Sequence, residues 1–380
     1  CLIARYYRYM TLLLGMKPNE HEYKLMGLAP YGKEVHGQRA LEIFRQTLFV
    51  DGIDFRWNIK PTDSYFWFRE RLEGQRFDNI AWALQTWVEE LLIDWVDNAI
   101  SQFGISTVVV SGGVAMNIKA MGKLASLPGV KEFFVPGSAA DESQAIGAGL
   151  CLYEDLRKEY DRSPSSYPAV DSLYLGPAYS EEEESAALTV VDTGKYNILD
   201  RFSNEDIVDR LIAGDVIGRC CGRMEFGQRS LGNRSLLADP ANPYIKEKIN
   251  SMIKSRDFWM PFAPIMLDTY RQRYLVGPNV DSPYMTIGFN TTPEGYDCMR
   301  AACHPADRTV RAQILKESMN PDMYRLLNAF SLKTGRGALL NTSFNIHGEP
   351  IVSSPRDAVD VLNRSALDGL LMNNYLILRK

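Results

Sequence analysis

The alternation of helical and extended segments between residues 77 and 160 constrains the fold more than any other feature. Apolar residues over 77–100 recur at three-and-four spacing, which predicts a long amphipathic helix. A short β-branched strand at 106–110, a glycine turn and a helix at 114–124 follow. A second strand at 131–135 and a second helix at 142–160 repeat this order. Alternating units of this kind predict an α/β fold.

A Ser- and Pro-rich segment at 161–172 lacks any periodicity and is the best linker candidate. We therefore place a domain boundary near residue 170, with a first half at 1–170 and a second half at 171–380. In the second half, Ser203 and Asp206 predict a capped helix that runs to residue 213, followed by a strand at 216–220. Further predicted elements are a helix at 321–333, a strand at 338–340 and a helix at 355–363.

Composition limits the classes of partner. The 380 residues carry a formal charge of −5, which argues against a protein that binds nucleic acid mainly through its overall electrostatic field. Small-molecule partners are therefore favoured. No stretch approaches the ~20 apolar residues that span a bilayer, so we expect no membrane association. The six cysteines show no CxxC pair and no dense disulfide spacing, which favours a reducing cytoplasm.

Two positions in the first half suggest a ligand. Gly112 and Gly113 lie between a strand and a helix, where bare backbone can approach a phosphate, and Asn117 follows them. Tight helix packing explains the glycines as well, and Asn117 could bind a base or ribose or cap a turn. Asp141 precedes a helix, so it is either an N-cap or a ligand of a metal or nucleotide.

Residues 219–239 hold the densest chemistry, because arginines alternate with glycines there. Arginine forks bind phosphate in a bidentate manner, and glycines let the backbone come near, so an anion site is the favoured interpretation. The alternative is a surface loop whose arginines pair with Glu225 and Asp239. The arginines are Arg219, Arg223, Arg229 and Arg234.

Two further groups of polar residues could contribute to the same pocket. Lys254 and Arg256 are two residues apart, a spacing that in an extended strand places both on one face. A predicted buried strand ends in a cluster of hydrogen-bonding side chains, which are costly to bury without hydrogen-bond partners. A turn rich in Asn and Ser is the alternative for that cluster, which comprises Asn341, Thr342, Ser343 and Asn345.

Taken in order, these motifs resemble the ATP-dependent O-carbamoyltransferase family, which includes nodulation-factor, aminoglycoside and cephalosporin carbamoyltransferases. The resemblance covers almost the whole chain. It implies part of an actin-like ATPase domain, similar to the tRNA threonylcarbamoyl transferase, followed by a YrdC-like α/β domain. The motifs are EYKLMGLAPYG (22–32), SGGVAMN (111–117), AADESQAIGAG (139–149), GRMEFGQRSLGNRSLLADP (222–240), PFAP (261–264) and LNTSFNIHGEPIV (340–352).

The resemblance also implies a chemistry. The second half is expected to make carbamoyl-adenylate from carbamoyl phosphate and ATP, with Mg²⁺ accompanying the ATP, and the first half to pass the carbamoyl group to a hydroxyl of a small molecule. Lys254 and Arg256 resemble the family's lysine-x-arginine pair, and with Arg229 and Arg234 they are the expected catalytic residues. Nucleotide binding is assigned to Gly112, Gly113, Asn117, Arg223, Asn341, Thr342, Ser343 and Asn345.

The first half departs from the family at its metal site. Relatives hold an iron-type divalent metal with a histidine pair, HxxxH, whereas this chain has only His21, His36, His304 and His347, and no two are so spaced. Asp141 is the one metal ligand that can be placed. We therefore expect the remaining ligands in an N-terminal part that this chain lacks.

Two alternatives remain at the level of function. One is a threonylcarbamoyl enzyme acting on tRNA, which the negative charge disfavours; the other is a nucleotide-binding module without transfer activity. The acceptor cannot be read from these residues, and a homodimer is a possible state, as in other family members.

Overall fold

The first half is built around one long helix, α5 (Phe77–Phe103), where the apolar spacing predicts it. The structure, a computed structural model, describes residues 3–160 and 172–380. α5 ends at Gly104, whose left-handed φ of 68° suits a residue without a side chain. The elements before it are α1 (Ala4–Leu13), α2 (Glu22–Leu28), a 3₁₀ turn (Ala29–Tyr31), α3 (Glu34–Arg45), β1 (Leu48–Asp51), β2 (Asp54–Trp57) and α4 (Ser64–Arg71).

The strand and helix units after α5 form as expected, with one difference. β3 (Thr107–Val109) pairs in parallel with β4 (Glu132–Phe134). The helix expected at 114–124 is split into a 3₁₀ turn (Gly113–Met116) and α6 (Ile118–Ala125), because the Asn117 side chain accepts a hydrogen bond from the Ala120 amide and caps a new helix. A 3₁₀ turn (Asp141–Ser143) then leads into α7 (Gln144–Glu159).

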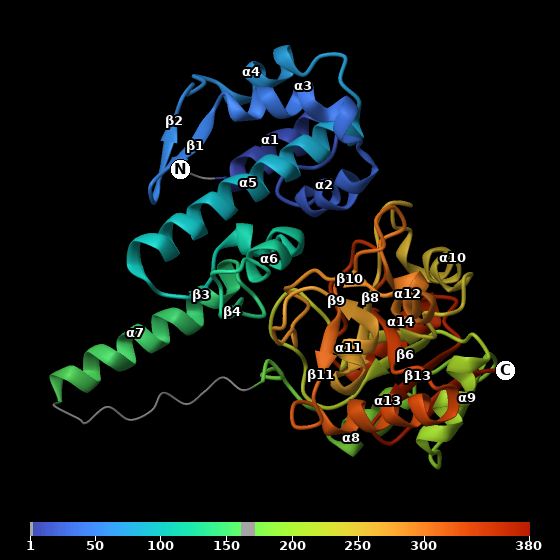
Figure 1. Cartoon of the computed structure of the whole chain (residues 1–380). Coiled ribbons are helices and arrows are strands. Elements are labelled where there is room, and N and C mark those ends of the chain that lie inside the picture. Colours follow the sequence, from blue (N-terminus) through green and yellow to red (C-terminus); the bar gives the residue numbers. More distant parts are fainter. Residues whose placement is uncertain (1–2, 161–171) are drawn as a thin grey trace.

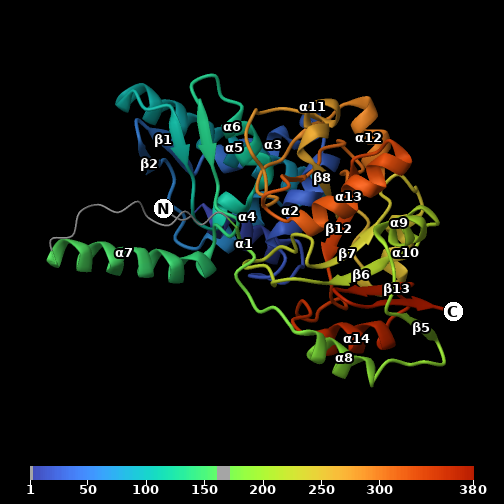
Figure 2. The ribbon, with the colours of Figure 1, turned by 90° about the horizontal axis from the view of Figure 1, so that it is seen from below.

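α7 extends away from the other elements (Figures 1 and 2), and none of its residues is buried. A side-chain carbon at Gly147 or Gly149 would have open space around it among the described residues. The domain boundary predicted near residue 170 lies outside the described residues.

The second half contains an eight-stranded mixed sheet in the order β11-β8-β12-β7-β6-β13-β14-β5. Only β11 with β8 and β6 with β13 pair in parallel. The strands are β5 (Tyr196–Leu199), β6 (Ile217–Cys220), β7 (Arg234–Ala238), β8 (Ala263–Leu267), β11 (Gln313–Leu315), β12 (Ala338–Ser343), β13 (Gly369–Met372) and β14 (Leu376–Arg379). The α/β class is confirmed, while the actin-like and YrdC-like arrangement stays a prediction.

Helices cover both faces of this sheet (Figures 1 and 2). α9 (Asn204–Ile212) and α13 (Pro321–Thr334) pack on one face through an apolar cluster, and α8 (Glu181–Leu188) and α14 (Pro355–Arg364) pack through a second cluster. The capping box of Ser203 and Asp206 is confirmed at the start of α9. The smaller elements are α10 (Ile245–Ile249), a π-helical turn (Asn250–Lys254), α11 (Arg271–Tyr274), β9 (Leu275–Val276), β10 (Asn290–Thr291) and α12 (Pro293–Met299).

The two halves meet along a close interface. The Gly288 amide donates to the Ile118 carbonyl at 2.9 Å, and a side-chain carbon at Gly122 would lie only 2.3 Å from the Gly288 oxygen. His304 hydrogen bonds to the Gly27 carbonyl at 2.7 Å, and Lys24 forms an ion pair with Asp257 at 2.9 Å. These contacts fix the position of the first half against the second half.

Candidate functional site

Four cations of the second half gather at one edge of the large sheet. Arg311 precedes β11, Arg256 precedes β8, and Arg229 lies in the loop before β7. The pairing of Asn341 with Ala263 and of Ser343 with Ser235 brings the end of β12 to the same edge. We call Arg229, Lys254, Arg256 and Arg311 the cation cluster.

Burial lowers the pKa of every member of the cluster, and the charge of neighbouring arginines lowers the pKa of three of them. Burial and the charge of Arg256 lower the pKa of Lys254 to about 6, and the same two causes lower the pKa of Arg229 to about 10. Burial lowers the pKa of Arg256 as well. The pKa of Arg311 is well below its usual range because of burial and the charges of Arg229 and Arg256.

No carboxylate compensates this charge. Among residues 3–160 and 172–380, neither Arg229 nor Arg311 forms an ion pair or a hydrogen bond, and the buried Arg229 Nε has no partner. Unpaired buried cations are costly, so a protein retains them where an anion completes the site. The cluster therefore has the electrostatics of a polyanion pocket.

Lys254 and Arg256 do not lie on an extended strand. Lys254 ends the π-helical turn, and Ser255 adopts a left-handed backbone with φ 44°. Because that residue reverses the chain direction, both flanking side chains turn to the same side. The two residues therefore do not lie on an extended strand. They nevertheless lie close enough for the charge of Arg256 to lower the pKa of Lys254, after the larger effect of burial.

The polar residues at the end of β12 line the cluster. Lys254, only 2% exposed, donates to Ser343 Oγ at 3.0 Å and to Asn345 Oδ1 at 2.5 Å. Arg256 donates to Thr342 Oγ1 at 3.0 Å. These contacts hold the two cations in place and leave their remaining donors for a ligand. β12 extends to Ser343, beyond the predicted 338–340.

Asn341 has a supporting place. Its amide donates to the Ser230 carbonyl at 3.2 Å and to Gln313 Oε1 at 3.1 Å. These bonds tie the residues next to Arg229 and Arg311 onto β12. Asn341 is fully buried, and its hydrogen bonds place it behind the cluster.

The other predicted arginines lie apart from the cluster. Arg223 donates to the carbonyls of Leu175 and Gly176 at 2.7 and 3.0 Å. Arg234 donates to backbone carbonyls that include Cys221 and Ser353, both at 2.9 Å. Their guanidinium groups are thus engaged in holding loops together. The alternative of pairing with Glu225 or Asp239 is also not observed, since Glu225 accepts from backbone amides and Asp239 pairs with Arg336.

Arg311 is the member of the cluster that the sequence did not reveal. It stands in no glycine-rich motif, and β11 is a short strand that pairs with β8 rather than with its sequence neighbours. Only the parallel pairing of these two strands brings Arg311 beside Arg256.

The predicted nucleotide residues of the first half divide into two groups. Gly112 and Gly113 are exposed, and the Gly112 amide donates to the Ala139 carbonyl at 2.7 Å, which brings the two small-residue loops together. Asn117 instead points inward, with 8% exposure, and hydrogen bonds to Tyr7 and Gln85. The structure gives Asn117 the capping role that was its alternative.

Asp141 lies at an exposed turn, 3.3 Å from the Gln144 amide nitrogen. Within the described residues, no group of three or more His, Cys, Asp or Glu side chains could hold a metal. The described residues therefore offer Asp141 but no further ligands for the expected iron-type site, and we derive no chemistry from it. The neighbouring Glu142 accepts from Gln228 at 2.7 Å, which places this turn beside the loop that carries Arg229.

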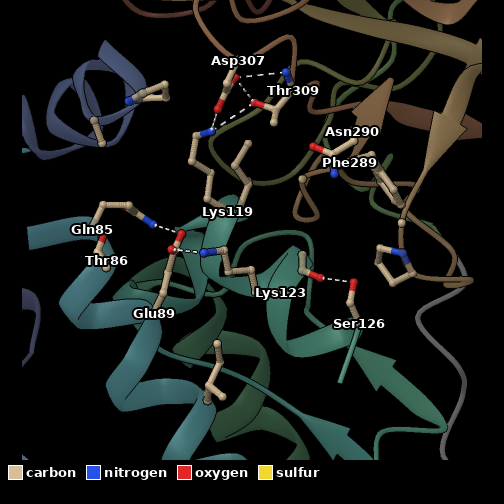
Figure 3. Close-up of a pocket in the computed structure, with 18 of the residues that line it drawn as sticks. Gln85, Thr86, Glu89, Lys119, Lys123, Ser126, Phe289, Asn290, Asp307 and Thr309 are labelled. Atoms are coloured by element: carbon tan, nitrogen blue, oxygen red, sulfur yellow. Dashed lines mark hydrogen bonds and ion pairs between the residues drawn. The ribbon is translucent and has the colours of Figure 1, made fainter. Parts of the chain in front are cut away.

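Helix α2 of the first half closes one side of the cluster. The nearby Tyr23 hydroxyl raises the pKa of both Arg229 and Arg256, against the larger effect of burial. Lys24 is fixed beside it by the ion pair with Asp257. The motif at 22–32 thus places Tyr23 near the cluster, while its Ala29, Pro30 and Gly32 line a cleft of about 650 Å³ between the halves. Figure 3 shows this cleft.

The fold and the site together define an α/β protein with a cluster of cations at one edge of its large sheet. Two family models match it: "Carbamoyltransferase N-terminus" over residues 2–150 and "Carbamoyltransferase C-terminus" over residues 208–379. The chain belongs to the carbamoyltransferase family. In the described residues, no helix is both long and apolar enough to cross a membrane.

Two curated relatives have informative names. Nodulation protein NolO of Bradyrhizobium diazoefficiens is 31% identical over 94% of this chain and 66% of its own length. The 3'-hydroxymethylcephem-O-carbamoyltransferase of Amycolatopsis lactamdurans is 29% identical over 67% of this chain and 45% of its own length. The chain thus spans less than two thirds of each relative. A crystal structure of full-length HypF in the phosphate- and nucleotide-bound form aligns with 49% of this chain and 22% of HypF, at 15% identity and a TM-score of 0.32, too low to bear on the fold.

Proposed function

We propose that this chain acts in O-carbamoyl transfer, and that its second half makes carbamoyl-adenylate from carbamoyl phosphate and ATP. The observation that carries this proposal is the cation cluster, in which Arg229 and Arg311 have no carboxylate partner among the described residues. Family membership gives the reaction class, and the cephem carbamoyltransferase is a relative named for transfer to oxygen.

The proposed chemistry balances in three steps. Water cleaves carbamoyl phosphate into carbamate and phosphate. A carbamate oxygen then attacks the α-phosphorus of ATP, and pyrophosphate leaves, which gives carbamoyl-adenylate. Finally, a hydroxyl of a small molecule attacks the carbamoyl carbon, AMP leaves, and the hydroxyl proton passes to solvent.

The cation cluster suits the second of these steps. Charge moves onto the departing pyrophosphate, and fixed guanidinium groups stabilise such charge without reorganisation. Arg256 sits at the centre, because its charge acts on the other three members. Thr342, Ser343 and Asn345 hold the cations through their side-chain oxygens. Mg²⁺ would accompany the ATP as substrate complex.

Pyrophosphate release tests this proposal. We expect release from ATP only when carbamoyl phosphate is present. Arg256→Ala should lower release by about 10- to 150-fold, since a charge-assisted bond contributes about 1.5–3 kcal/mol. Arg201→Ala is the matched control, because Arg201 is exposed and distant in sequence from the cluster. Release that ignores carbamoyl phosphate, or that survives Arg256→Ala, would contradict the proposal.

A separate assay addresses the transfer step. Release of AMP from preformed carbamoyl-adenylate in the presence of a hydroxyl acceptor measures transfer alone. Adenylate formation without transfer would mean that the first half of this chain lacks the transfer activity. Nucleotide binding without adenylate formation would instead favour a binding module.

A further inference from the structure

Lys254 is the lysine of the cation cluster, and its buried amine has a fixed place. Its Nζ donates to Ser343 Oγ at 3.0 Å and to Asn345 Oδ1 at 2.5 Å. Within residues 3–160 and 172–380, this amine forms no other hydrogen bond and no ion pair. A protonated lysine has three donors, whereas a neutral one has two and a lone pair. The two acceptors therefore satisfy a neutral amine and leave its lone pair unengaged.

The electrostatic surroundings favour the same neutral form. Burial, and after it the charge of Arg256, lower the pKa of Lys254 to about 6. The amine is therefore largely unprotonated at pH 7.5. A neutral lysine amine that is removed from water and lies beside another cation is a nucleophile. Lys254 thus combines a fixed position with a reactive lone pair.

The arginines of the cluster lack an anion. Arg256 donates to the Pro261 carbonyl at 3.2 Å and to Thr342 Oγ1 at 3.0 Å, so three of its five N–H donors have no partner among the described residues. Its charge acts on both Arg229 and Arg311. A carboxylate formed beside these guanidinium groups would be stabilised by charge-assisted hydrogen bonds and would offset the cost of their burial.

We propose that Lys254 captures CO2 and carries it as a lysine carbamate, whose carboxylate is held by Arg256 and the positive charge of the cluster. The Nζ lone pair attacks the carbon of CO2, and an N–C bond forms. One C–O π pair moves onto oxygen, and an amine proton passes to solvent. A neutral side chain thereby becomes an anion. CO2 is small and uncharged, so neither the burial of Lys254 nor the surrounding charge excludes it.

The carbamate would compete with a polyphosphate, because both anions need the same guanidinium donors. Only this competition rests on the proposed function; the carbamate itself depends on the cluster alone. CO2 should therefore weaken binding of a non-hydrolysable ATP analogue, and the analogue should release the bound CO2. The chain would thus be sensitive to dissolved CO2 when its nucleotide site is empty.

The test is NMR of protein labelled with ¹⁵N at its lysine amines, equilibrated with ¹³C-bicarbonate as the source of ¹³CO2 at pH 7.5 without nucleotide. A ¹³C–¹⁵N coupling demonstrates the covalent bond, whereas bound bicarbonate shows none. We expect one coupled resonance in the wild type, its loss in Lys254→Met, and its disappearance at pH 5, where the amine is protonated. Arg256→Met should lower the formation constant of the carbamate by about 10- to 150-fold, as loss of a charge-assisted bond implies.

Lys246→Met is the matched control. The charge of Arg256 and burial lower the pKa of Lys246 too, but its amine donates to the Phe258 carbonyl at 2.8 Å and lies outside the cluster as defined. This variant should keep the coupled resonance. Thermal melts establish that each variant is folded, and the wild-type spectrum requires no variant.

Three results would each overturn the proposal: no coupled resonance in the wild type, including bound bicarbonate only; a resonance that survives Lys254→Met; or a formation constant that Arg256→Met leaves unchanged. Adding the ATP analogue separates this proposal from the proposed function. Loss of the resonance supports a shared site. If the carbamate forms but the analogue leaves it in place, the modification stands and the proposed nucleotide site fails.

Discussion

Lys254 offers a quantitative test of the anion pocket, because its pKa of about 6 leaves it largely neutral at pH 7.5 when the pocket is empty. A bound polyphosphate would restore the charged form. Protonating this amine at pH 7.5 costs about 2 kcal/mol, from 1.5 pKa units at about 1.4 kcal/mol each. Binding of a polyphosphate at that pH should therefore take up close to one additional proton.

The assay is calorimetric titration with a non-hydrolysable ATP analogue in buffers of different ionisation enthalpy. The dependence of the observed heat on the buffer gives the number of protons taken up. Lys254→Met serves as the reference, since the analogue's own titration is the same for both proteins. We expect wild type to exceed the variant by about one proton at pH 7.5 and by clearly less at pH 5.5. Equal uptake by both proteins at pH 7.5 would refute this account of the site.

The other predictions concern single residues. Lys254→Met should raise the melting temperature most near pH 6, and this gain should fade as the pH rises toward 10. The reason is that the unfolded state binds more protons than the folded state between these pH values. A lower melting temperature of the variant at pH 6 would contradict this. Arg311→Leu should weaken binding of the ATP analogue by about 10- to 100-fold without lowering the melting temperature, since no described residue forms a hydrogen bond or ion pair with Arg311. Unchanged affinity in calorimetry would place the phosphates elsewhere. Asn117→Ala should destabilise the protein by about 1–3 kcal/mol in urea melts, because Asn117 hydrogen bonds to Tyr7 and Gln85 in the core. Pyrophosphate release should persist. A stable variant that no longer binds the nucleotide would return Asn117 to the ligand site. Tyr23→Phe should weaken the analogue by up to about tenfold, and an unchanged affinity would remove α2 from the pocket.

The local patterns of the sequence predicted much of the fold. α5 follows from three-and-four spacing, and α9 follows from a capping box at Ser203. Such signals depend on neighbours in the sequence, so they can be recognised without knowledge of the tertiary structure. The order of the eight strands depends instead on long-range pairing, and the short strand β11 carried too little pattern to be recognised.

The candidate site was partly predictable for the same reason. Arg229, Lys254, Arg256 and the residues at the end of β12 lie in dense local motifs, and the structure brings them together. Arg223 and Arg234 share those motifs, yet the backbone carbonyls around them engage their donors. Residue type alone does not distinguish an arginine that binds a ligand from one that binds a loop.

The metal site shows a further limit. Asp141 was assigned as a metal ligand from the family resemblance, and it lies at an exposed turn. The described residues hold no group of three or more possible ligands, so the assignment stays a prediction. A ligand set depends on several segments meeting in space, which a single aspartate at a helix start does not reveal.

The position of bound phosphates tests the central claim most directly. A crystal structure of this chain with the non-hydrolysable ATP analogue would show where the triphosphate lies. We expect its oxygens within hydrogen-bonding distance of Lys254, Arg256 and Arg311, with the Arg229 Nε gaining a partner. A triphosphate bound at Gly112 and Gly113, with the cation cluster left empty, would contradict the assignment of adenylate formation to the second half.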